Sequence, residues 1–158
     1  MINYRKYTEN DLDYIVSKQN LLSLHHQQYD KEYYKQSANS KQEFKNYILK
    51  RISADDFNVI IAESNEGIIG YVMGWIKSRP PIYDIKKIGY LSNIFVDKEI
   101  RNAGVGKNLF TELEKWFKDK GVNYIEIKSD ARNNDTIKKF RNYGFENLSI
   151  SFYKKIRQ

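Results

Sequence analysis

The chain has 158 residues, 41% of them hydrophobic and 15% aromatic, which is enough to bury a core within one domain. Its 27 Lys and Arg against 20 Asp and Glu give a formal net charge of +7, and the lysines are scattered instead of gathering in a tail. The sequence has no cysteine, which excludes disulfides, thiol nucleophiles and cysteine-based zinc sites. It has no run near the ~20 apolar residues of a membrane span and no signal-peptide core at its start, so it predicts a cytoplasmic protein.

The N-terminal third predicts one strand followed by two helices. Residues 2–8 alternate in polarity as a strand does. Thr8 can cap a helix, with Asp11 as the acidic partner three positions later, and the helical pattern continues through residue 34. The segment SKQE at residues 40–43 is a second capping box, ahead of a helix that extends to residue 52.

The rest of the chain alternates strands and helices. Residues 57–63 and 68–77 form an expected hairpin across the turn SNEG, and a further strand follows at 87–96. Residues 105–120 place Val105, Leu109, Leu113 and Trp116 on one face of a helix. A strand at 122–129, a helix at 134–143 and a closing strand at 146–156 complete the predicted order β-α-α-β-β-β-α-β-α-β.

The segment RNAGVG, residues 101–106, joins the strand at 87–96 to the next helix. A strand, a glycine turn and a helix together present free amide N–H groups to an anion. The turn is not a Walker loop, which would need glycine at 101 and Ser or Thr at 108, nor a dinucleotide fingerprint, which would need glycine at 109. Two interpretations remain from these residues alone: a plain turn, or a nest of amides that holds a pyrophosphate.

Two motifs resemble the GNAT superfamily of acyl-CoA-dependent N-acyltransferases. The segment IFVDKEIRNAGVG, residues 94–106, is similar to the fourth strand and pyrophosphate loop of that family. The segment NNDTIKKFRNYGFE, residues 133–146, is similar to its second motif. The resemblance implies a single N-acetyltransferase domain over residues 1–158. It also implies an α/β (α+β) GNAT fold with a mixed, mostly antiparallel, twisted sheet of six to seven strands and about four flanking helices.

The resemblance also implies acetyl-CoA as co-substrate and assigns the residues that bind it. The turn from Arg101 to Lys107 would hold the pyrophosphate, and the strand at Ile94, Phe95 and Val96 would pair with the pantetheine arm in a gap between splayed strands. The complete set of expected contacts is Ile94, Phe95, Val96, Arg101, Asn102, Ala103, Gly104, Val105, Gly106, Lys107, Asn133, Thr136, Lys139 and Phe140.

The proton-transfer groups depart from the family pattern. Tyr90 stands where many members have a glutamate, and among the acidic residues that remain (Glu126, Asp130 and Asp84) we prefer Asp130 as the base. The usual tyrosine acid is replaced by Phe140, while Tyr143, one turn later, is either a core residue or the acid.

The expected function is therefore transfer of an acetyl group from acetyl-CoA to a primary amine of a small molecule, by direct attack on the thioester. The alternatives are acetylation of a protein N-terminus or lysine, and a catalytically weak acyl-CoA-binding sensor. Neighbouring His25 and His26 lack carboxylates at ligand spacing, so we expect no metal. We expect neither nucleic acid nor membrane as partner, and a homodimer is compatible with this interpretation.

Overall fold

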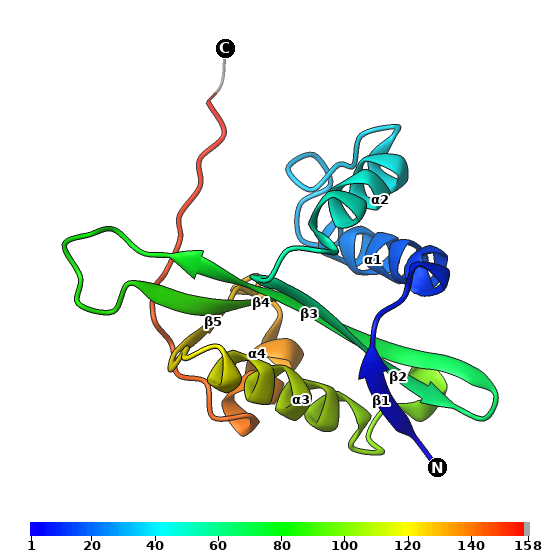
Figure 1. Ribbon diagram of the computed structural model, residues 1–158. Helices are drawn as coiled ribbons and strands as arrows, with labels where there is room; N and C mark the ends of the chain where they lie inside the picture. The colour runs from blue at the N-terminus through cyan, green and yellow to red at the C-terminus, as the bar shows by residue number, and fades with distance from the viewer. Residues whose placement is uncertain (157–158) are drawn as a thin grey trace. The chain divides into compact units, whose positions relative to one another are not determined.

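The computed structural model describes residues 1–156, which fall into two compact units, residues 1–128 and residues 129–156. The first unit holds five strands and three α-helices, with 3₁₀ turns at Glu9–Asp11 and Lys98–Ile100 (Figure 1). Its elements are β1 (Asn3–Lys6), α1 (Leu12–His26), α2 (Ser40–Arg51), β2 (Phe57–Ser64), β3 (Gly67–Ser78), β4 (Lys87–Val96), α3 (Val105–Asp119) and β5 (Ile125–Ile127). The second unit holds α4 (Asn134–Asn142) and the residues that follow it.

The sheet of the first unit has the order β1-β2-β3-β4-β5. The first three pairings are antiparallel, whereas β4 and β5 are parallel. A parallel pair needs a crossover, and α3 provides it. The mixed, mostly antiparallel α/β architecture predicted from the sequence is thereby confirmed.

Two predicted elements are wrong. The predicted closing strand at 146–156 is not formed, so the sheet has five strands within the described residues instead of six to seven. An alternating sequence becomes a strand only where another strand accepts its hydrogen bonds, and the single chain pairs no strand with this segment. The first helix ends at His26, and the segment to residue 34 forms turns.

The two faces of the sheet are covered by different helices. In Figure 1, α1 and α2 lie on one side of the strands and α3 lies on the other. Gly74 and Gly89 allow α3 to pack closely, because a Cβ on either residue would come within 3.1 Å or less of the Phe117 ring. The face of α3 that the sequence predicted is buried at Val105 and Leu109, each at 1% exposure or less.

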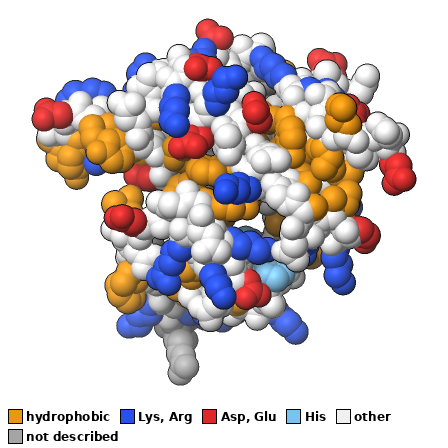
Figure 2. All heavy atoms as spheres, turned by 90° about the horizontal axis from the view of Figure 1, so that it is seen from below, with side chains coloured by type: hydrophobic (Ala, Val, Ile, Leu, Met, Phe, Trp, Pro, Cys, Tyr) orange, Lys and Arg blue, Asp and Glu red, His pale blue; other side chains and the backbone are white. Residues whose placement is uncertain are grey.

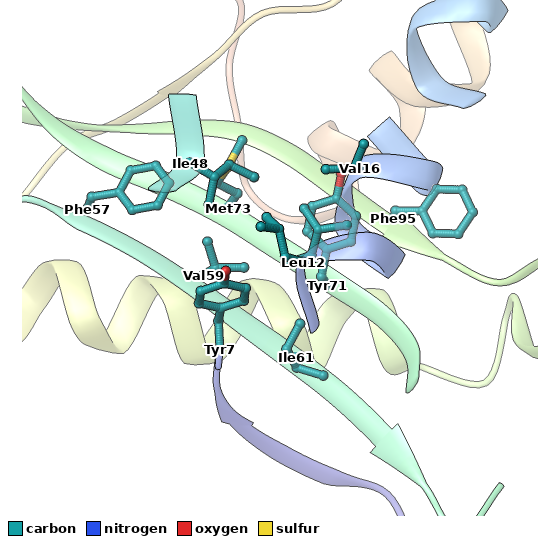
Figure 3. Packing of buried hydrophobic residues seen from close by; sticks show 11 residues of the cluster. Tyr7, Leu12, Val16, Ile48, Phe57, Val59, Ile61, Tyr71, Met73 and Phe95 are labelled. Atoms are coloured by element: carbon teal, nitrogen blue, oxygen red, sulfur yellow. The ribbon is translucent and has the colours of Figure 1, made fainter. Parts of the chain in front are cut away.

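The main core lies between the sheet and the helices α1 and α2 (Figure 3). Its members alternate along the central strands, so one side of each strand contributes to it. The cluster consists of Tyr7, Leu12, Ile15, Val16, Ile48, Phe57, Val59, Ile61, Tyr71, Met73 and Phe95. Because Phe95 belongs to this core, β4 is held firmly near its C-terminal end.

A buried ion pair fixes the entry into α1. The Asp11 carboxylate accepts the Thr8 backbone N–H at 2.7 Å, as the predicted cap requires. The same carboxylate binds both terminal nitrogens of Arg5, at 2.7 and 2.8 Å, and Arg5 also contacts Glu63. Hydrogen bonding from Arg5 holds the pKa of Asp11 below its usual value, against an opposing effect of burial. The carboxylate is therefore a charged member of the fold at neutral pH.

The surface carries charges of both signs. Figure 2 shows Lys and Arg side chains interspersed with Asp and Glu side chains on one face of the protein. Within residues 1–156, no helix is long and apolar enough to cross a membrane.

Candidate active site

The central feature of the site is an open edge on β4. β4 pairs with β5 only at Gly89–Ile125, Tyr90–Glu126 and Leu91–Ile127. From Asn93 to Val96 it continues to pair with β3 on its other side, while on the β5 side no strand of the described chain pairs with it. Peptide groups along this edge are thus available to a ligand with amides of its own.

The point where β4 and β5 part coincides with an irregularity in β4. Met73 of β3 lies opposite Asn93, but the next residue, Gly74, lies opposite Leu91. Ser92 is therefore an extra residue, and such a bulge increases local twist and redirects the strand. The sequence gives no obvious signal for it, because neither glycine nor proline stands at this position.

The turn after β4 presents backbone amides at the N-terminus of α3. Asn102 and Gly104 have positive φ values of 71° and 80°, which shape the turn, and residues 101–104 are exposed. The carbonyl of Gly104 receives the N–H of Asn108 at 3.0 Å, so the amides of residues 105–107 precede the first helical hydrogen bond. With the helix dipole behind them, these amides favour an anion.

Arg101 sits between this turn and the end of β4. Its Nε donates to the carbonyl of Val96 at 3.1 Å, and its guanidinium lies 6.0 Å from the centre of the Phe95 ring. The side chain is exposed. Arg101 therefore places a positive charge at the surface, at the start of the turn.

Helix α1 anchors the same end of β4. Lys18 Nζ lies 2.6 Å from the Asp97 carboxylate, and the Tyr14 hydroxyl donates to that carboxylate at 3.0 Å. Further back on the strand, the Asn93 amide donates to Gln19 at 2.6 Å. These contacts fix both the strand and the start of the turn against one helix.

Tyr90 lies in a cluster of aromatic and charged side chains. Its ring is 5.0 Å from that of Trp75, and Lys77 Nζ lies 5.0 Å from its centre. Lys77 also pairs with Glu126 at 3.1 Å. Burial, and secondarily the charge of Glu126, raise the pKa of Tyr90, so this phenol remains protonated at neutral pH. Lys77 was not among the predicted site residues, because its approach to Tyr90 depends on strand register.

In the second unit, Asp130 belongs to a tight local arrangement. Its carboxylate accepts the backbone N–H of Arg132 at 3.0 Å and two of the guanidinium nitrogens of that residue at 2.8 Å. Only 5% of the Asp130 side chain is exposed. The geometry gives this carboxylate a structural task in the turn before α4.

The predicted residues of the second motif lie on and around α4. Asn133 caps the helix by accepting the Thr136 N–H at 3.2 Å, and Lys139 is exposed. Phe140 is buried, with its ring 6.5 Å from that of Tyr143. Burial raises the pKa of the half-buried Tyr143. The structure thus brings the predicted residues together as two groups, one in each unit.

No group of three or more His, Asp or Glu side chains in the described part of the chain could hold a metal ion. The first unit offers hydrogen-bond donors and anion-binding amides beside an open strand.

An open strand edge that leads into an amide-lined turn at a helix N-terminus is an arrangement suited to a long ligand that carries both amides and phosphates. Residues 19–145 match the model of the Acetyltransferase (GNAT) family, and the chain belongs to this family.

Similarity to individual proteins is lower. An uncharacterised N-acetyltransferase of Methanocaldococcus jannaschii is 26% identical over 152 residues, which cover 92% of this chain. The match covers 61% of that relative, so the chain spans about three fifths of its length.

Several solved structures share the fold. A Bacillus halodurans protein aligns with a TM-score of 0.82 at 15% identity, over 98% of this chain and 99% of that one. An aminoglycoside 6'-N-acetyltransferase from Acinetobacter baumannii aligns with a TM-score of 0.78 at 15% identity, over the full length of both chains. The aminoglycoside acetyltransferase AAC(6')-Iy, in complex with a bisubstrate analogue of CoA and acetylneamine, aligns with a TM-score of 0.72 at 21% identity, over 99% of both.

Proposed function

We propose that this protein is an acetyl-CoA-dependent N-acetyltransferase that acts on a primary amine of a small molecule, by direct attack of the amine on the thioester. The observation that carries the proposal is the open edge of β4 beyond Leu91, which continues into the amide-lined turn at residues 101–107. Family membership and the CoA and bisubstrate complexes of AAC(6')-Iy support it.

Acetyl-CoA would bind along these features in order. The amides of the turn and Arg101 would hold the pyrophosphate, with charge-assisted hydrogen bonds worth about 1.5–3 kcal/mol each. Ile94, Phe95 and Val96 would pair with the pantetheine arm through their backbone, because the Phe95 side chain is buried in the core. The Val105 side chain is also buried, so only its amide is offered to the ligand. Asn133, Thr136, Lys139 and Phe140 would contact the remainder of the coenzyme.

The chemical step needs a polarised thioester carbonyl and a neutral amine. A backbone N–H near Phe95 or Val96 would donate to the carbonyl oxygen as negative charge develops on it. The amine, with a pKa of about 10 in water, must lose a proton before or during attack. Because burial raises its pKa, the Tyr90 phenol stays protonated at neutral pH and cannot accept this proton directly.

Three acidic residues were candidates for the base. Asp84 is exposed in the loop between β3 and β4, so Asp130 and Glu126 remain. Asp130 is engaged with Arg132 and nearly buried, whereas Glu126 lies beside Tyr90 and keeps 29% of its side chain exposed. We therefore add Glu126 to Asp130, with Tyr90 as a relay through water. Comparing kcat for Glu126→Gln and Asp130→Asn distinguishes them: the residue whose amide variant loses about 10²–10⁴-fold at neutral pH is the base.

A catalytically weak acyl-CoA sensor is the second candidate function. It is favoured by one observation: Phe140 has no hydroxyl to protonate the leaving thiolate, and the tyrosine beside it, Tyr143, follows the last residue of α4 with its ring 6.5 Å away. Acetylation of a protein N-terminus or lysine remains an alternative acceptor chemistry. A homodimer is also part of the proposal, whereas a single domain over residues 1–158 and a cytoplasmic location stay predictions of the sequence.

The experiment begins with thermal unfolding in the presence of acetyl-CoA, CoA or ATP. Ligand at a hundredfold excess over Kd stabilises the native state by about 2.7 kcal/mol, so both CoA species should raise Tm and ATP far less. Release of free thiol is then measured with a panel of small amines, aminoglycosides and lysine peptides. Thiol release with small amines supports the enzyme, binding without release supports the sensor, and no Tm shift with either CoA species refutes both.

A further inference from the structure

Four side chains of β3, β4 and β5 share one face of the sheet at the point where β4 and β5 part. Trp75 is opposite Tyr90 in the ladder between β3 and β4, and Tyr90 is opposite Glu126 in the ladder between β4 and β5. Opposite residues direct their side chains to the same face, and Lys77, two residues after Trp75, shares that face. The pair that follows is the last one before the edge of β4 opens. The group therefore borders the edge along which we place the pantetheine arm.

Lys77 makes two contacts within this group. Its Nζ lies 3.1 Å from Oε2 of Glu126 and 5.0 Å from the centre of the Tyr90 ring. The other carboxylate oxygen, Oε1, forms no hydrogen bond with a described residue, and 29% of the Glu126 side chain is exposed. Lys77 thus holds one oxygen of the carboxylate and leaves the second one to water.

The Tyr90 ring is fixed by aromatic packing. The ring of Trp75 lies 5.0 Å from it, stacks on Phe57 and lies 5.1 Å from the guanidinium of Arg51. Phe57 belongs to the main core, and Arg51 is the last residue of α2. Because the Tyr90 ring is held in this way, its contact with Lys77 restricts where the lysine places its charge.

We propose that Lys77 is a positioning residue for acetyl transfer, which holds the Glu126 carboxylate beside Tyr90 so that Oε1 takes a proton from the acceptor amine through one water. The inference rests on the proposed function and deepens it, because it assigns the role of base to Glu126. Asp130 is less suited to that role: both of its carboxylate oxygens accept hydrogen bonds from Arg132, whereas Lys77 engages only one oxygen of Glu126.

The step conserves protons and bonds. The acceptor amine has a pKa of about 10 in water and is an ammonium at neutral pH, so it first gives one proton through the water to Glu126. The neutral nitrogen then bonds to the acetyl carbon, the carbon–sulfur bond breaks, and the second N–H proton goes to the leaving thiolate. The products are the acetylated amine and CoA, and Glu126 returns its proton to the solvent.

The first test compares Lys77→Met with Lys87→Met by steady-state release of thiol. Lys87 is the exposed first residue of β4, opposite Ser78, and the same substitution there removes a charge without changing the group around Tyr90. Lys77→Met should lower kcat about 10- to 100-fold, because a misplaced catalytic group costs up to ~10²-fold, while the KM for acetyl-CoA and Tm stay near the wild-type values. Lys87→Met should keep the wild-type kcat. Lys77→Arg, which restores a cation, should recover most of the loss.

The second test combines Lys77→Met with Glu126→Gln. If Lys77 acts through Glu126, the double variant should be about as slow as Glu126→Gln alone, which should lose about 10²–10⁴-fold in kcat. Losses that multiply, a wild-type kcat for Glu126→Gln, or equal behaviour of the two methionine variants would overturn the inference. A Lys77→Met variant that raises only the KM for the amine would also overturn it, since Lys77 would then contact the acceptor. A wild-type protein that releases no thiol with any amine is a separate result, which removes the proposed function and this inference with it.

Discussion

Replacing Gly104 by alanine separates the structural and the binding roles of the turn before α3. Gly104 has φ of 80°, and a Cβ there would meet nothing within 4 Å. The cost to folding is therefore only that of a left-handed alanine, roughly 1–2 kcal/mol, or about 2–8 °C in Tm for a chain of this size. The open space in front of the residue is where we place the pyrophosphate.

A methyl group in that space should weaken acetyl-CoA binding. Loss of one charge-assisted amide contact, worth about 1.5–3 kcal/mol, raises the KM for acetyl-CoA roughly 10- to 150-fold. Steady-state kinetics with the preferred amine, together with the Tm of the unliganded variant, measures both effects. The kcat at saturating acetyl-CoA should change much less than KM.

Gly121 provides a matched control at the other end of the same helix. Its φ is 72°, and a Cβ there also meets nothing within 4 Å, so Gly121→Ala imposes the same strain. It should lower Tm by a similar amount and leave KM unchanged. If Gly104→Ala lowers Tm but keeps the wild-type KM, or if both variants raise KM equally, the turn only bends the chain and the reasoning is refuted.

Two further predictions concern the chemistry and the fold. Phe140→Tyr should leave the affinity for acetyl-CoA unchanged, while kcat rises or stays flat. Tyr143→Phe should leave kcat nearly unchanged. If the Tyr143→Phe variant folds and binds acetyl-CoA but loses more than about a hundredfold in kcat, Tyr143 is the acid. Asp11→Asn should lower the free energy of unfolding by about 1.5–3 kcal/mol at pH 7, because it removes a charge-assisted pair with Arg5. Folding lowers the pKa of Asp11, so the stabilisation by its carboxylate is present at pH values above the unfolded-state pKa of 3.8 and is lost as pH falls through the folded-state pKa. The free energies of unfolding of the variant and the wild type, measured by urea titration, should therefore converge in strong acid.

The sequence predicted those features that depend on local pattern. The apolar positions of α3 recur at helical spacing, and that spacing alone identified the buried face that includes Val105 and Leu109. The turn from Arg101 to Lys107 was recognisable because its glycines are close in sequence. The family motifs then supplied the fold, and the structure confirms its mixed, mostly antiparallel sheet in the first unit.

Features that depend on distant partners were not predictable. Lys77 meets Glu126 only because β3, β4 and β5 pair in one particular register, and a shift of one residue would separate them. The engagement of Asp130 with Arg132 was also missed, since a pair two residues apart reads equally well as two surface charges. The prediction of a closing strand at 146–156 was wrong for a related reason. Alternating polarity shows that a segment can pair as a strand, but it does not show which strand it would pair with.

The brevity of the ladder between β4 and β5 bears on how the protein folds. The strands β2, β3 and β4 follow one another and can zip together from their turns, whereas β5 reaches β4 only after the chain has closed a loop that contains all of α3. Closing that loop costs entropy before any hydrogen bond is gained, and only three residue pairs repay it. We therefore expect the antiparallel strands to form early in folding, and the β4–β5 junction to form late and to be among the first regions to show amide hydrogen exchange under native conditions.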